Sequence, residues 1–78
     1  MNKPRATRFK LVVCLKNDDY PASLEPRKIY CAVADRTAAA QGLVRVIDES
    51  GEDYLYPTDY FASIDVPTAV RRALRMRA

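Results

Sequence analysis

Histidine and tryptophan are absent from this chain of 78 residues, and glycine occurs only twice, at Gly42 and Gly51. Without histidine, neither a serine nor a cysteine has the usual general base for nucleophilic catalysis. Two isolated glycines cannot form a glycine-rich phosphate-binding loop. Paired carboxylates are present, but they fall in predicted turns, where we expect no shift of their pKa values. These absences predict a protein that is not an enzyme.

Cysteine is also scarce. Cys14 and Cys31 form no Cys-x-x-Cys pair and have no histidine to complete a zinc site, so we expect no metal and no cofactor. Both cysteines fall in predicted strands, which favours small apolar core residues kept reduced in the cytoplasm over a disulfide or a reactive thiol. No apolar run approaches the roughly 20 residues that span a bilayer, and no signal-peptide core follows the charged N-terminus. We expect a cytoplasmic protein without a membrane partner.

Acidic residues are missing from both ends of the chain. Residues 1–16 carry five basic side chains and no acid, and residues 67–78 carry four arginines and no acid. The centre, residues 17–66, carries four basic and ten acidic side chains, so the net charge of +3 is the sum of two basic ends and an acidic body. The ends are candidates for phosphate contacts, or for contacts with the acidic body of the same or a neighbouring chain.

The length allows one domain, which buries roughly 60% of the surface of its unfolded chain. Short runs of apolar and β-branched residues, separated by turn signals, predict a mainly β protein, a small five-stranded barrel with a C-terminal α-helix. The expected strands are residues 9–15, 28–34, 43–47, 53–57 and 61–65. A long loop over residues 16–28 separates the first two, with Leu24 expected to return to the core. Asp35 is expected to cap a helical turn at 36–41 that ends at Gly42. Residues 58–60 are expected to form a turn of the 3₁₀ kind.

The chain divides into a flexible basic arm at residues 1–8, the β-domain at 9–66 and a basic amphipathic helix at 67–78. Pro67 occupies a favoured first helical position, and Val66, Ala69, Val70, Ala73 and Leu74 form an apolar stripe. A helix of this length is marginal alone in water, so we expect it to dock on the β-domain or on a partner.

The segment from Asp48 to Phe61 places a polar turn between two apolar runs and ends in Pro57-Thr-Asp-Tyr-Phe61. This ending resembles the proline-x-asparagine-tyrosine-hydrophobic signature of Src-homology-3 domains, with Asp59 in place of asparagine. Residues 23–33 resemble the leucine-led diverging turn of that family, and residues 44–55 resemble its central hairpin. The resemblance, over roughly residues 9–65, implies an Src-homology-3-like barrel and the binding of proline-rich ligands. The chain also resembles small bacterial proteins with this hairpin and Tyr-Phe ending, a resemblance that implies no activity.

The first candidate site is a rim of aromatic residues for a protein or peptide partner, made of Tyr20, Tyr54, Tyr56, Pro57 and Tyr60. If Leu55 points inward, strand alternation turns Tyr54 and Tyr56 outward, where flat rings suit a polyproline helix. The alternative is that Tyr54 and Tyr56 form cross-strand pairs or support the C-terminal helix, which leaves no surface for a ligand.

The second candidate site is a set of arginines for phosphate, namely Arg71, Arg72, Arg75 and Arg77. It predicts nucleic-acid or ribonucleoprotein association as the alternative function, and a solvated helix face is the structural alternative. A third possibility is that the helix drives homo-oligomerisation. The carboxylates Asp48, Glu49, Glu52 and Asp53 lack the spacing of a calcium loop, so a solvated acidic turn is favoured there.

Overall fold

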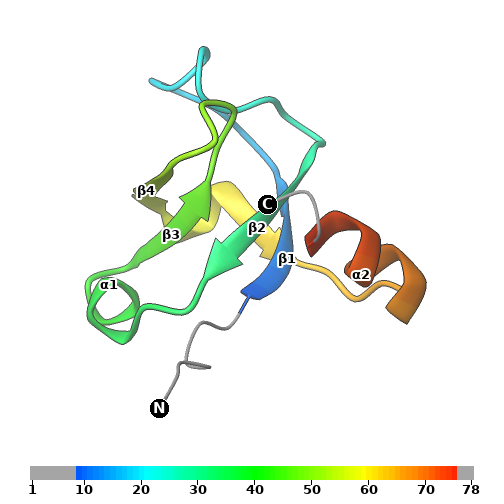
Figure 1. Ribbon diagram of the computed structural model, residues 1–78. Helices are drawn as coiled ribbons and strands as arrows, with labels where there is room; N and C mark the ends of the chain where they lie inside the picture. Colours follow the sequence, from blue (N-terminus) through cyan, green and yellow to red (C-terminus); the bar gives the residue numbers. More distant parts are fainter. Residues whose placement is uncertain (1–8, 76–78) are drawn as a thin grey trace.

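The structure, a computed structural model, describes residues 9–75. Its strands are β1 (Phe9–Cys14), β2 (Ile29–Val33), β3 (Leu43–Ile47), β4 (Asp53–Pro57) and β5 (Phe61–Ser63). Its helices are α1 (Arg36–Ala40), the 3₁₀ turn η2 (Thr58–Tyr60) and α2 (Thr68–Arg75). The strands form one antiparallel sheet in the order β4-β3-β2-β1-β5, drawn in Figure 1. The mainly β fold with a C-terminal helix is therefore confirmed. No ladder joins β4 to β5 in the described residues, so the sheet is open rather than a closed barrel.

The register of the strands decides which side chains form the core. Val12 lies opposite Tyr30, and Val44 lies opposite Tyr56, so these residues share one face of the sheet. The buried cluster on this face comprises Val12, Cys14, Leu24, Tyr30, Ala32, Val46, Tyr56, Tyr60 and Phe61. The opposite face also carries apolar residues, of which Leu11 is buried. Apolar residues on both faces explain why the sequence alone does not show which face of each strand points inward.

The turns and caps follow the local sequence signals. The Asp35 side chain accepts a hydrogen bond from the Ala38 N–H at 2.9 Å and so caps α1, as expected. Gly42 follows α1 with a φ of +76°, a conformation that glycine adopts without steric cost. Pro57 ends β4, an edge strand, where its missing N–H costs no ladder hydrogen bond. The predicted 3₁₀ turn after Pro57 is confirmed as η2.

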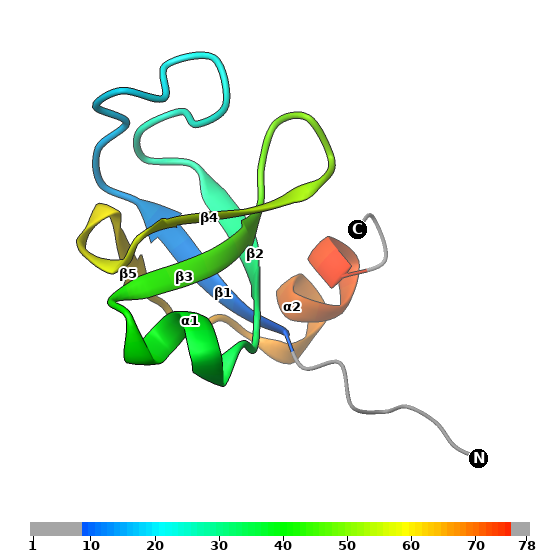
Figure 2. The same cartoon turned by 90° about the vertical axis from the view of Figure 1, so that its left-hand side faces the viewer.

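The long loop between β1 and β2 folds back against the sheet. Leu24 is fully buried, as predicted, and its carbonyl accepts a hydrogen bond from the Asn17 side chain at 3.1 Å. The loop lies at the same end of the molecule as the β3–β4 turn, as Figures 1 and 2 show. The Glu49 N–H donates to the Ser23 carbonyl at 3.1 Å, which joins the two segments. The loop is thus anchored by the burial of Leu24 and joined to the β3–β4 turn at Ser23.

The C-terminal helix α2 lies beside β1 and β2, away from β4 (Figure 1). Leu74 faces a hollow of about 510 Å³ that is also lined by Leu11, Ile29 and Ile47. The helix therefore meets the β-domain through Leu74, on the face opposite the tyrosines. The rest of the predicted apolar stripe does not dock, since Ala69, Val70 and Ala73 are exposed. The expected basic arm, residues 1–8, and the last turn of the expected helix, residues 76–78, lie outside the described residues.

Candidate functional site

Four of the five predicted rim residues come together in space. Tyr20 from the long loop, Tyr54 and Tyr56 from β4, and Tyr60 from η2 form what is here called the tyrosine cluster. Tyr20 is its centre, with ring centroids 4.8 Å from Tyr56, 6.0 Å from Tyr60 and 6.4 Å from Tyr54. Tyr54 and Tyr56 are 5.2 Å apart. Edge-on contacts of this kind stabilise by about 0.5–1.5 kcal/mol per pair beyond the area they bury.

The predicted exposure of Tyr56 and Tyr60 is wrong, because both rings belong to the core. Only 1% of Tyr56 and 8% of Tyr60 is exposed. The register pairs Tyr56 with Val44 on the core face, so Leu55 rather than Tyr56 points to the opposite side. Pro57 follows Tyr56 by one residue and therefore also lies on the opposite side of β4. A domain of this size has few large side chains, and its tyrosines supply much of the core volume.

The hydroxyl groups of the buried tyrosines are all hydrogen-bonded. Tyr56 donates to Asp48 Oδ2 at 2.5 Å, and Tyr60 donates to the Asp18 carbonyl at 2.9 Å. Burial, and then the hydrogen bond to Asp48, raise the pKa of Tyr56 to about 12. Burial also raises the pKa of Tyr60, and the nearby carboxylates of Asp19 and Asp18 raise it further. These phenols stay protonated at neutral pH and act as hydrogen-bond donors.

Tyr30, which the sequence analysis did not single out, plays the same part on β2. Its hydroxyl donates to Glu49 Oε2 at 2.6 Å and accepts from the Glu25 N–H at 2.8 Å. Burial is the main cause that raises the pKa of Tyr30, and the bond to Glu49 adds to it. The sequence signal that could have found Tyr30 is its alternation with Ala32 in a short apolar strand. It identifies a core ring, but it does not identify the partner of the hydroxyl.

The acidic turn is mostly solvated, as predicted, since Glu49, Glu52 and Asp53 are exposed. The expectation that its carboxylates have no shifted pKa is wrong for Asp48 and Glu49. Asp48 is half-buried and accepts hydrogen bonds from Tyr56 and from both the N–H and the hydroxyl of Ser50. Burial acts to raise the pKa of Asp48, but the bonds from Ser50 and Tyr56 outweigh it and lower the pKa. Glu49 forms an ion pair with Lys28 at 2.6 Å, and the hydrogen bonds from Lys28 and Tyr30 lower the pKa of Glu49. The turn is therefore a structural anchor, and residues 9–75 hold no cluster of ligands for a metal ion.

The part of the cluster that remains open to solvent is Tyr54, which is 56% exposed, and the half-buried Tyr20. Asp18 and Asp19, both exposed, precede Tyr20 in the loop. Lys16 Nζ lies 5.1 Å from the centre of the Tyr60 ring and covers that side of the cluster. Tyr20, Tyr54, Asp18 and Asp19 together are called the tyrosine rim below. It offers two aromatic rings beside two carboxylates.

The predicted arginine set lies elsewhere. Arg71 is half-buried and Arg72 is exposed, and both are on α2 rather than beside the tyrosine rim. The side chain of Arg75, and Arg77 as a whole, lie outside the described part of the chain. The structure therefore places three of the four arginines on α2 and describes the side chains of two of them, and their role as phosphate ligands stays a prediction.

Comparison with family models, curated proteins and solved structures finds no match to the chain. Within residues 9–75 no helix has the length and apolar character needed to cross a bilayer. The evidence on function therefore comes from the geometry of the residues themselves.

Proposed function

We propose that this protein is a non-enzymatic module that binds an extended protein or peptide segment through the tyrosine rim, and that it acts in the cytoplasm. The observation that carries the proposal is the convergence of the long loop, β4 and η2 on the tyrosine cluster. The long loop there meets β4 and the adjoining η2, which begin more than 30 residues after Tyr20 in the chain, and Tyr20 and Tyr54 stay open to solvent. Tyrosine at such a place offers a large flat surface with little conformational entropy to lose on binding.

The chemistry of the rim favours a basic, proline-containing segment as its ligand. Proline-rich segments adopt a polyproline helix that packs against aromatic rings without a further ordering cost. Asp18 and Asp19 lie beside those rings, so an arginine or lysine of the ligand finds a carboxylate there. The paired carboxylates Asp48 and Glu49 are engaged by tyrosine hydroxyls and Lys28, and they are not part of this surface.

The order of the elements supports a relationship to Src-homology-3 domains. A long loop follows β1, a hairpin joins β3 to β4, and a 3₁₀ turn ending in tyrosine precedes β5. We propose that the sheet is an Src-homology-3-like barrel that is open between β4 and β5. The proposal predicts a ligand surface beside the long loop, and the tyrosine rim, from this loop and β4, is our candidate for it.

The test is the affinity of a labelled proline-rich peptide with two arginines, measured by fluorescence anisotropy. Tyr54→Ala removes an exposed ring and leaves the core intact, so we expect roughly tenfold weaker binding, as for a truncated aromatic anchor. Val70→Ala, on the exposed side of α2, is the control and should bind as the unmodified protein does. Equal affinities for all three proteins, or no measurable binding, would contradict the proposal.

A further inference from the structure

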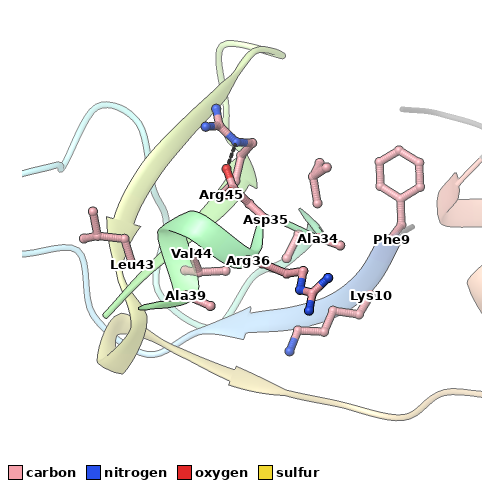
Figure 3. A pocket seen from close by; sticks show the side chains of 11 residues that line it. Phe9, Lys10, Ala34, Asp35, Arg36, Ala39, Leu43, Val44 and Arg45 are labelled. Carbon is pink, nitrogen blue, oxygen red and sulfur yellow. Dashed lines mark hydrogen bonds and ion pairs between the residues drawn. The ribbon is translucent and has the colours of Figure 1, made fainter. Parts of the chain in front are cut away.

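A groove opens near α1, and it shares no residue with the tyrosine rim. It has a volume of about 520 Å³, within the range of roughly 300–1,000 Å³ that small-molecule sites occupy. Its apolar lining comprises Phe9, Ala32, Val33, Ala34, Ala39, Leu43 and Val44. Three basic residues, Lys10, Arg36 and Arg45, and one acidic residue, Asp35, complete it (Figure 3).

The charges of this groove are not balanced. Arg45 is held by Asp35 at 2.8 Å and by Asp53 at 3.0 Å. The other oxygen of Asp35 accepts the capping bond from the Ala38 N–H, so both oxygens of this carboxylate are already engaged. Neither Lys10 nor Arg36 forms an ion pair with any residue in the range 9–75. Two positive charges therefore face one opening without a counter-ion from the described residues.

Lys10 and Arg36 reach the groove from different elements, and their positions are set by backbone structure. Lys10 lies opposite Ala32 in the β1–β2 ladder, and Arg36 is the first residue of α1, which the Asp35 cap fixes. Figure 3 shows the two charged head groups on the same side of the groove, with the Phe9 ring standing apart from them. One lysine and one arginine match the two negative charges and the acceptor oxygens of a terminal phosphate.

The net charge of the surroundings strengthens this assignment. Residues 9–75 contain nine basic and ten acidic side chains, so the described part of the protein carries a net charge of 9 − 10 = −1. A local excess of two positive charges on a slightly acidic body marks a specific place rather than a generally basic surface.

We propose that this groove binds a nucleoside phosphate, with the phosphate on Lys10 and Arg36 and the base against Phe9. A nucleotide carries its flat apolar part and its charge at opposite ends, as this groove does. The base contributes by stacking on an aromatic ring, which depends little on its identity. The ligand can be a free mononucleotide or one unit of a single-stranded nucleic acid, because both present the same chemistry.

The experiment titrates the full-length protein with inorganic phosphate, AMP, a tetranucleotide of single-stranded RNA and a tetra-aspartate peptide, following amide shifts by NMR. We expect AMP to shift residues of the groove. Lys10→Gln and Arg36→Gln should each weaken AMP binding roughly tenfold, the loss expected for one hydrogen-bonded charge. Both side chains are exposed, so these variants keep the fold. Arg72→Gln makes the same change of charge on α2 and should have no effect.

The aromatic part of the proposal has its own variant. Phe9→Leu should weaken AMP binding and leave the binding of inorganic phosphate unchanged, since only the base contacts the ring. Tetranucleotide binding at least tenfold tighter than AMP would assign a nucleic-acid strand, and equal binding would assign a free nucleotide. No shift of groove residues, equal losses in all three charge variants, or tighter binding of the tetra-aspartate peptide would overturn the proposal. None of these results bears on the tyrosine rim, which has no residue in common with the groove.

Discussion

A buried phenol is stable only where its hydroxyl has a partner, and each buried tyrosine here meets that condition. Tyr30, Tyr56 and Tyr60 donate to Glu49, Asp48 and the Asp18 carbonyl, respectively. The acceptors belong to the β3–β4 turn and the long loop, so the same side chains fill the core and hold two loops in place. Tyr56 and Tyr60, which sequence patterning assigned to a binding surface, therefore contribute mainly to the stability of the fold.

Tyr56 gives the first prediction. Tyr56→Phe removes only the hydroxyl and should lower the free energy of unfolding by about 1–2 kcal/mol, because the half-buried Asp48 loses a donor. Tyr56→Ala removes the ring and should cost about 3–5 kcal/mol, as for other large buried side chains. A domain of this size has a total stability of only about 3–5 kcal/mol, so the alanine variant should be largely unfolded. Urea denaturation measures both, and a folded Tyr56→Ala protein of near-normal stability would show that the ring is not in the core.

The second prediction concerns alkaline pH. The folded-state pKa of Tyr56, about 12, lies above its ordinary value of 10.0. Stability from this group is therefore complete below pH 10 and is lost as the pH rises from 10 toward 12, where the unfolded chain releases the proton first. Urea midpoints between pH 8 and 12 should fall over this window, and Tyr56→Phe should flatten the fall. An unchanged slope in the variant would assign the alkaline loss to other groups.

The third prediction concerns backbone strain in the long loop. Arg27 has a φ of +70°, a region that costs an ordinary L-residue roughly 1–2 kcal/mol. Arg27→Gly relieves that cost but adds freedom to the unfolded chain, so we expect a net gain of about 0.5–1 kcal/mol. Asp19→Gly, at a φ of +72°, is the matched comparison and should gain less, because aspartate tolerates this region better. Thermal denaturation decides the matter, and a loss of stability in Arg27→Gly would mean that the arginine side chain has a role the backbone does not explain.

At the scale of elements, the signals that act over a few residues predicted the structure well. The Asp35 cap, the stop at Gly42, the strand end at Pro57 and the 3₁₀ turn each depend on one residue and its immediate neighbours. The inward face of β4 depends on a register with β3 that lies outside the segment itself. Because Leu55 and Tyr56 are both apolar, alternation left two alternatives, and the outward one, on which the candidate site depends, is wrong for Tyr56.

The capping residue of α1 provides an element-scale prediction. Asp35→Asn keeps an acceptor for the Ala38 N–H but loses the ion pair with Arg45, whereas Asp35→Ala loses both. We expect Tm to fall by roughly 4–8 °C in the alanine variant, the usual effect of a lost cap in a small domain, and by less in the asparagine variant. Calorimetry measures Tm for the unmodified protein and the two variants. Equal losses in both variants would show that the ion pair, rather than the cap, fixes α1.

For the whole molecule, the sequence predicted the mainly β domain, the C-terminal helix and the meeting of the tyrosines better than it predicted their burial. Whether the sheet closes, and which of its faces α2 contacts, depend on long-range packing. Because both faces of the sheet carry apolar residues, the sequence did not show which face α2 contacts. The groove at Lys10 and Arg36 escaped the sequence analysis because the two residues lie in separate elements, and only the fold shows that Asp35 is already engaged by Arg45 and the helix cap.

The most direct test of the central claim is a ¹⁵N–¹H correlation spectrum of the full-length protein titrated with a proline-rich peptide that contains two arginines. Peptide binding at the tyrosine rim should give saturable shifts at Asp18, Asp19, Tyr20 and Tyr54, and these shifts should be lost when the two arginines of the peptide are replaced by glutamates. Shifts confined to α2 or to the groove at Lys10 and Arg36, with no change at Tyr20 and Tyr54, would contradict peptide binding at the tyrosine rim.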